Sequence, residues 1–316
     1  YLIVQNHTHR LPCLFTGQRP GAGFALPQNP NVLREWVFLL HRPAFCNALK
    51  LAPPLYTQAA HRMNLRHRQV HLFFNALTFF TRLPAPTWVE FSEENLNHAS
   101  RYFTWVGLLV GACAALVYAA AETVLPATIA ILLSMVATIW LTGGFHEDGL
   151  ADVCDGFGGG WEKQQILRIM KDSRLGTYGA LGLCLALLFK FQMLNALEMI
   201  VPALILGHVL SRFAAVSIIA SEPYVREDAD SKAKPLANRM SRIELLVAAV
   251  PVLICLLPLD PAIWGVLVPV WLMRSWLVRL FRRWIGGYTG DCLGATQQLC
   301  ELTVYLYFCL PFLITA

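Results

Sequence analysis

The chain has 316 residues, of which 56% are hydrophobic and only 14% are charged, and its formal net charge is +5. Soluble domains carry about 25% charged residues, so this composition excludes an ordinary soluble protein and favours one that crosses a membrane several times. The small positive charge is spread over several loops, so no nucleic-acid partner is expected.

Residues 1–62 differ in kind from the rest of the chain. They mix many prolines with scattered basic and apolar residues, and they show no sustained hydrophobic period. They also lack the compact order of basic, apolar and small residues that marks a secretory signal. We interpret them as a weakly ordered N-terminal extension, expect Met63 to be the native start, and assign residues 63–316 to one integral-membrane domain.

An amphipathic segment and a series of apolar segments follow in chain order. Residues 71–82 lead into a proline-rich stretch and are predicted to lie at the membrane interface. The apolar segments are close to the roughly 20 residues that cross about 30 Å of hydrocarbon. They are 104–124, 127–142, 178–197, 199–220, 243–259, 262–280 and 302–316. The pattern predicts an all-α, polytopic membrane bundle of about seven spans arranged as helical hairpins.

The connections between these segments alternate in length and charge. Those at 122–126, 198–202 and 257–261 are short, contain prolines and hold almost no basic residues. The other three are longer and carry lysines and arginines. Because each short connection closes a hairpin, the long connections fall on one side of the membrane, and the positive-inside rule makes that side cytoplasmic.

The first long connection carries the most informative motif of the chain. Asp148, Asp152 and Asp155 are spaced i, i+4 and i+7, so a helix places the three carboxylates on one face. Crowded carboxylates repel one another, and hard cations such as Mg²⁺ bind such oxygens together with substrate phosphates. The surrounding glycines indicate close approach, since glycine is costly in a helix. Solvated loop charges are the alternative interpretation.

Cations and a second acidic motif accompany these aspartates. Lys171 and Arg174 follow in the same connection and are suited to a doubly anionic substrate. In the last long connection, Asp291 lies among four glycines beside the pair Arg282 and Arg283. A phosphate-binding loop and a tight turn both explain that segment.

Three ionisable residues lie inside predicted spans. Lys190 is near the middle of the third span, and His208 and Arg212 are four residues apart near the cytoplasmic end of the fourth. Ionisable residues in a span are candidates for function. For Arg212 the alternative is that its long side chain reaches the membrane interface. The sequence names no partner for Lys190.

Four segments together resemble one known family. They are FFTRLPAP at 79–86, TGGFHEDGLADVCDG at 142–156, MKDSRLGTYG at 170–179 and GYTGDCLGA at 287–295. They are similar to the cobalamin synthases, the adenosylcobinamide-GDP ribazoletransferases of bacterial B12 assembly. The likeness runs from about residue 63 to the end. Glu147 departs from the family pattern, which has an apolar residue there in many members, but it should lie off the face that carries Asp148 and Asp155.

The resemblance implies a phosphoryl-transfer reaction in the inner membrane of a bacterium, with its active-site loops in the cytoplasm. A hydroxyl of α-ribazole, or of its 5′-phosphate, attacks the pyrophosphate of adenosylcobinamide-GDP, and GMP leaves. The implied cofactor is Mg²⁺ on Asp148, Asp152 and Asp155, with Asp155 also the candidate general base and Asp152 also catalytic. The other implied site residues are Lys171 and Arg174 as catalytic phosphate-holding groups and His146, Asp172, Ser173, Arg212, Thr289 and Asp291 as substrate contacts. Other enzymes of nucleotide-loop assembly are the implied protein partners.

Two other function classes compete with this interpretation. CDP-alcohol phosphotransferases also use spaced aspartates at a membrane helix, but their pattern has an arginine after the alanine, where this chain has Asp152 after Ala151. A transporter with an acidic site is the second rival, and it favours carboxylates near the membrane midplane. Here the aspartates follow the second span, which favours an interfacial enzyme.

Overall fold

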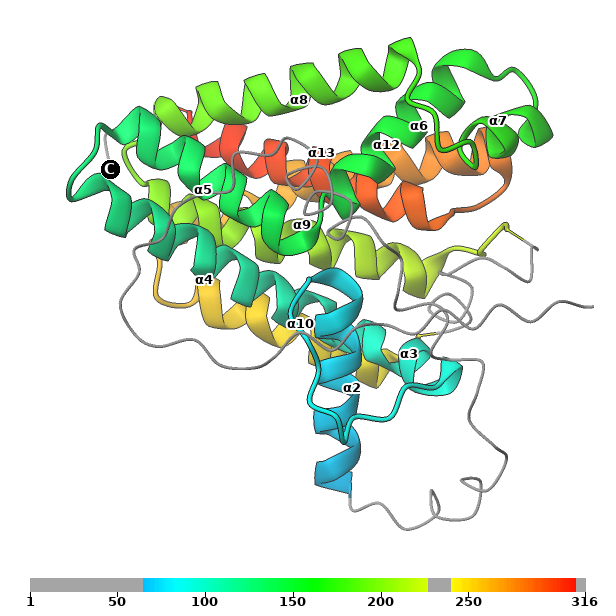
Figure 1. Ribbon diagram of the computed structural model, residues 1–316, viewed down its shortest axis with the longest axis horizontal. Coiled ribbons are helices and arrows are strands. Elements are labelled where there is room, and N and C mark those ends of the chain that lie inside the picture. The colour runs from blue at the N-terminus through cyan, green and yellow to red at the C-terminus, as the bar shows by residue number, and fades with distance from the viewer. Residues whose placement is uncertain (1–64, 227–239, 311–316) are drawn as a thin grey trace, which may run out of the picture. The chain divides into compact units, whose positions relative to one another are not determined.

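The computed structural model describes residues 65–226 and 240–310, and every regular element within these ranges is a helix (Figure 1). The predicted all-α class is therefore confirmed. The predicted N-terminal extension, residues 1–62, lies outside the described residues. The helices are α2 (Leu65–Phe80), α3 (Glu93–Ala99), η3 (Ser100–Tyr102), α4 (Phe103–Glu122), α5 (Ala127–Thr142), α6 (Phe145–Gly159), α7 (Lys163–Ile169), α8 (Thr177–Asn195), α9 (Ile200–Ser221), α10 (Arg242–Leu256), α11 (Pro261–Trp264), α12 (Leu267–Ile285) and α13 (Gly290–Phe308).

The number of membrane-capable helices is lower than the predicted seven. In the described residues four helical segments are long and apolar enough to cross a membrane, and α5 and α6 make a fifth only when they are taken together. α10 has 15 residues, short of the roughly 20 that a straight span needs. α13 carries buried polar side chains, among them Gln297, Gln298 and Glu301.

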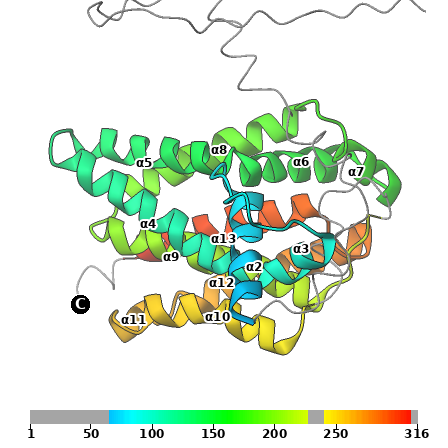
Figure 2. The same cartoon turned by 60° about the horizontal axis from the view of Figure 1, so that its bottom comes forward.

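Helix α9 lies at the centre of the bundle. It packs along α4 and α13, and 83% of its most apolar window is buried, against 22% for α8. Figures 1 and 2 both place α8 and α10 on opposite sides of it. Glycine permits a close contact between α4 and α9, because a Cβ on Gly107 would lie 2.6 Å from the carbonyl oxygen of His208.

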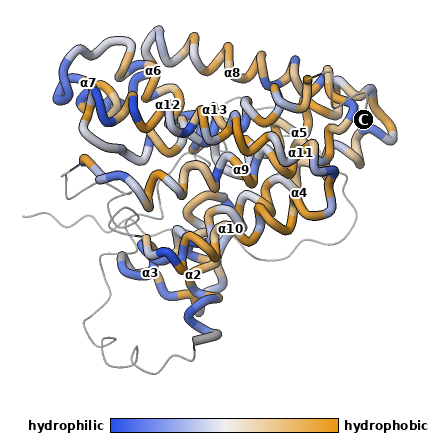
Figure 3. The backbone as a smooth tube through the Cα atoms, turned by 180° about the vertical axis from the view of Figure 1, so that it is seen from behind, coloured by the Kyte–Doolittle hydropathy of each residue, from blue (hydrophilic) through white to orange (hydrophobic). Residues whose placement is uncertain are grey.

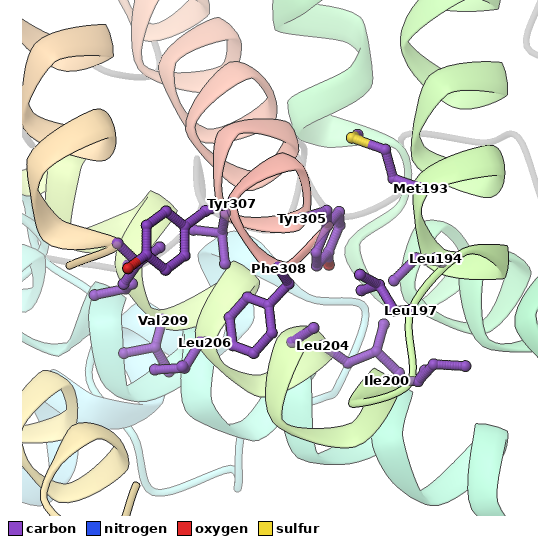
Figure 4. Close-up of a cluster of buried hydrophobic side chains, with 14 of the residues drawn as sticks. Met193, Leu194, Leu197, Ile200, Leu204, Leu206, Val209, Tyr305, Tyr307 and Phe308 are labelled. Atoms are coloured by element: carbon purple, nitrogen blue, oxygen red, sulfur yellow. The ribbon is translucent and has the colours of Figure 1, made fainter. Parts of the chain in front are cut away.

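A tightly packed apolar cluster closes the end of the bundle away from α6. Figure 4 shows side chains of α8, α9 and α13 meeting there, with Tyr305 and Phe308 of α13 among them. At the other end, hydrophilic stretches gather around α7 and its neighbouring loops, as they also do along α2 and α3 (Figure 3). The apolar end therefore supports the bundle, and the polar end is the place to look for chemistry.

A sharp break separates α5 from α6. Gly143 and Gly144 have φ values of 71° and 70°, a left-handed conformation that glycine adopts without steric cost, and the two helices are bent by 86°. α6 contains Asp148, Asp152 and Asp155. The connection predicted as glycine-rich loop is thus helical here, and the i, i+4, i+7 spacing places the carboxylates as a helix requires.

The predicted boundaries of the last span were wrong. The prediction was 302–316, whereas α13 begins at Gly290, with Thr289 as its N-cap. Of the glycine-rich segment around Asp291, which was predicted to be a phosphate-binding loop or a tight turn, only residues 286–289 lie outside a helix. The buried polar residues of α13 lower its hydropathy and hide its first half from a hydropathy criterion. Residues 311–316 lie outside the described residues.

Candidate active site

The site is built where α6 crosses α13. A Cβ on Gly149 would lie 3.0 Å from the carbonyl oxygen of Asp291 and 3.2 Å from the Cα of Gly294. Two glycines facing each other allow the helix backbones to come this close. The crossing brings the carboxylate face of α6 beside the first turn of α13, which holds Asp291.

Four carboxylates gather at this crossing, which we call the acidic crossing: those of Asp148, Asp152, Asp155 and Asp291. Asp148 is exposed, and Asp152 and Asp155 are partly buried. The negative charges of Asp291, Asp148 and Asp155 all act electrostatically on Asp152. The structure therefore joins the two acidic motifs that the sequence placed more than a hundred residues apart.

Asp155 has a structural role in addition to any chemical one. Its Oδ2 accepts a hydrogen bond from the backbone N–H of Gly176 at 2.7 Å, and its Oδ1 accepts one from that of Gly179 at 2.8 Å. These donors belong to the start of α8, where backbone N–H groups have no partner within the helix. The carboxylate thus caps α8. A Cβ atom at either glycine would clash with the Asp155 carboxylate and displace it.

The loop between α7 and α8 holds four of the predicted site residues at the surface. Lys171, Asp172 and Ser173 are exposed. Arg174 donates to Asp172, with Nη2 and Oδ2 2.6 Å apart, and its side chain is 87% exposed. Hydrogen bonds from Arg174 lower the pKa of Asp172. In this conformation the guanidinium of Arg174 is paired with a neighbour and does not reach the acidic crossing.

Arg226 is a site residue that sequence reasoning did not single out. Its Nη2 lies 2.8 Å from Oδ2 of Asp291 and 3.3 Å from the carbonyl oxygen of Met170. The preceding residues are held in place because Val225 and Tyr288 are joined by a backbone hydrogen bond of 3.0 Å. Arg226 lies in the second long connection and contacts residues of the first and the third. The three long connections therefore meet at one end of the bundle, as the hairpin pattern predicted. Its presence among the basic loop residues was the only signal in the sequence.

The ionisable residues inside the spans form a buried network. Lys190 of α8 lies with its Nζ 2.6 Å from Oε1 of Glu301 on α13, which supplies the partner that the sequence left unnamed. Glu301 also accepts hydrogen bonds from Tyr305 and Gln297. Arg212 is only 2% exposed, so its side chain lies in the bundle instead of reaching the interface.

The network continues to the first turn of α6. Gln298 donates to Gln297 and to Glu147, each at 3.0 Å. Glu147 is buried whereas its neighbour Asp148 is exposed, which confirms that it lies off the acidic face. His146 is also buried, and it lines a pocket of aromatic side chains. The polar interior therefore ends directly beneath the carboxylates of α6.

Comparison with known proteins identifies the family. Residues 72–309 match the sequence model of the family described as Cobalamin-5-phosphate synthase. The chain belongs to this family. The adenosylcobinamide-GDP ribazoletransferase of Shewanella amazonensis is 53% identical over 251 residues, which are 77% of this chain and 96% of the relative. That of Shewanella frigidimarina is 52% identical over 245 residues, 76% of this chain and 94% of the relative. No solved structure matches the chain.

In this member of the cobalamin-5-phosphate synthase family, the acidic crossing suits a metal ion that protein and substrate bind together. It suits a metal ion held by protein ligands alone less well. No group of three or more His, Cys, Asp or Glu side chains in the described ranges forms a ready metal site. Mg²⁺ is usually held by one or two carboxylates together with substrate phosphates and water. Asp148 and Asp152 supply that donor type, whereas Oδ2 of Asp291 is paired with Arg226. The residues present fit such an ion.

Proposed function

We propose that this protein joins adenosylcobinamide-GDP to α-ribazole, or to its 5′-phosphate, with release of GMP. The observation that carries the proposal is the acidic crossing of α6 and α13, with Arg226 bound to Asp291, in a chain of the cobalamin-5-phosphate synthase family. In phosphoryl transfer the protein mainly positions the reacting groups and neutralises their charge. The crossing offers both: oxygen donors for a cation, and basic side chains beside them.

The atoms balance in a single displacement. The acceptor hydroxyl oxygen forms a bond to the phosphorus that bears the cobinamide, the bond from that phosphorus to the GMP oxygen breaks, and the hydroxyl proton passes to a carboxylate. Asp148 and Asp152 would hold Mg²⁺, which when bound would neutralise charge on the pyrophosphate oxygens. We propose Asp155 as the proton acceptor, a role that it would combine with capping α8.

Basic groups and the membrane complete the proposal. Lys171 and Arg174 lie in the exposed loop before α8 and are suited to hold phosphate, for which Arg174 would exchange Asp172 for substrate. Ser173 of the same loop and Thr289 before α13 would contact substrate. By the positive-inside rule, the basic connections support a site on the cytoplasmic side of the inner membrane. A bulky substrate handled there also suits transfer between the enzymes of nucleotide-loop assembly.

The proposal is tested by GMP release from the full chain in detergent, given both substrates with and without Mg²⁺. Release should require both substrates and Mg²⁺, and Asp148→Ala should lower it by roughly 100-fold or more. Glu198→Ala is the matched control, because Glu198 is an exposed carboxylate after the far end of α8. Normal release by Asp148→Ala, or an equal loss in Glu198→Ala, contradicts the site. Transfer of a CDP-linked headgroup without cobinamide would instead favour the lipid enzyme.

A further inference from the structure

A pocket of aromatic side chains also holds His146 and Arg212, two of the substrate contacts that the resemblance implied, and the proposed displacement gives it no role. Phe79 and Phe80 at the end of α2, Phe103 of α4 and Phe145 at the start of α6 line it. The ring of Phe80 lies 4.1 Å from that of Phe103 and 5.8 Å from that of Phe145, centroid to centroid. The FFTRLPAP segment of the sequence thus contributes the wall of a pocket.

Three polar side chains in this pocket have atoms without a protein partner. Both ring nitrogens of His146, Nε of Arg212 and the hydroxyl of Tyr288 are buried and lack a hydrogen-bond partner among the described residues. These side chains are 5%, 2% and 0% exposed. Buried polar groups are normally hydrogen-bonded, and each one left unmatched is costly. The number and position of these buried polar atoms indicate that a ligand supplies the missing hydrogen-bond partners.

The pocket is also joined to the acidic crossing through the chain itself. Phe145 lies three residues before Asp148, on the first turn of α6. On the other side, Gly290 and Gly294 line the pocket, and Gly290 directly precedes Asp291 on α13. A ligand in the pocket therefore lies near the first turns of α6 and α13, which also carry Asp148 and Asp291.

We propose that this pocket binds the planar heteroaromatic base of the ribazole acceptor, stacked among the phenylalanines, with the ribose directed toward the acidic crossing. The inference rests on the proposed function. Aromatic walls favour a flat ring, and an N-glycosylated benzimidazole-type base keeps one unsubstituted ring nitrogen, which accepts a hydrogen bond. Tyr288 and Arg212 have donors without a protein partner.

The guanine of the donor substrate fits this pocket less well. Guanine presents several donors and acceptors along its edges, and each would need a partner once buried. Four phenylalanines line the pocket, and it offers three polar side chains with unmatched atoms. A lipid acyl chain would leave all three unmatched. The acceptor base matches both the apolar walls and the small number of polar atoms.

The test uses benzimidazole as a probe of the pocket and Phe145→Leu as the variant. Phe145 is 40% exposed, so leucine there should leave the fold intact. Phe189→Leu is the control, because Phe189 is an exposed phenylalanine on α8 that does not line the pocket. In the wild type, benzimidazole should compete with the acceptor and not with adenosylcobinamide-GDP. Phe145→Leu should raise the acceptor KM and the benzimidazole inhibition constant roughly two- to tenfold, as the loss of an aromatic contact implies.

The KM of adenosylcobinamide-GDP separates the outcomes. It should stay unchanged in Phe145→Leu. A rise in that KM alone would assign the pocket to the base of the donor substrate. An equal rise in the KM of donor and acceptor would show a general disturbance of the site, and either result overturns the assignment. GMP release by the wild type without benzimidazole competition refutes the pocket and leaves the proposed function standing. If the wild type releases no GMP, the proposed function fails. Equilibrium dialysis then decides on the pocket: benzimidazole binding that Phe145→Leu weakens supports it, and equal binding to both proteins overturns it.

Discussion

The buried pair of Lys190 and Glu301 makes the strongest prediction about stability. Their side chains are 4% and 1% exposed, and Nζ lies 2.6 Å from Oε1. Lys190→Met leaves the Glu301 carboxylate buried without its cation. Breaking a buried pair costs about 3–5 kcal/mol. Because Tyr305 and Gln297 still donate hydrogen bonds to Glu301, we expect the lower end, about 3 kcal/mol less free energy of unfolding.

The partner substitution completes a double-mutant cycle. Glu301→Gln leaves the Lys190 ammonium buried without its carboxylate partner and should lower the free energy of unfolding by a similar amount. The ammonium still lies over the Tyr305 ring, 5.9 Å from its centroid. The double variant, Lys190→Met with Glu301→Gln, removes both charges and should lose less than either single variant, because neutral replacement of a buried pair is often tolerated.

The assay is equilibrium unfolding of the full chain in mixed detergent micelles with increasing sodium dodecyl sulfate. Helical content reports unfolding, and the midpoints of the four proteins give the cycle. A loss below about 1 kcal/mol in Lys190→Met, or a double variant that loses the sum of the two single losses, would show that the charges do not depend on each other. Either result would refute the buried-pair reasoning.

Three further predictions concern α6. Asp155→Asn should lower the free energy of unfolding by about 1 kcal/mol through the lost cap on α8, measured by the same titration; a lost GMP release with unchanged stability would show a purely chemical role. Gly149→Ala should destabilise by roughly 1–3 kcal/mol, since its Cβ would meet the α13 backbone, whereas Gly159→Ala, with an ordinary contact at 3.6 Å, should be neutral or gain up to about 1 kcal/mol; equal effects would contradict the close crossing. Removal of divalent cations with EDTA should abolish GMP release and added Mg²⁺ should restore it, and release that survives EDTA would argue against a metal at Asp148 and Asp152.

Local patterns predicted the elements that depend on neighbouring residues. The apolar run at 127–142 predicted α5 with its bounds, and the spacing of Asp148, Asp152 and Asp155 predicted a helical face that α6 provides. The start of α13 was missed because its polar residues face other helices instead of lipid. A hydropathy scale weighs each residue alone and does not know what covers it.

The sequence by itself therefore determined an all-α membrane bundle, the acidic face of α6 and the family, because apolar length and helical period are local properties of the chain. Only the tertiary structure decided that Glu301 is the partner of Lys190, that Asp155 caps α8 and that Arg226 binds Asp291. These contacts join segments that are distant in sequence, and they follow from how closely the helices pack. The glycines at the crossing of α6 and α13 set that distance, and no local pattern specifies which helix they meet.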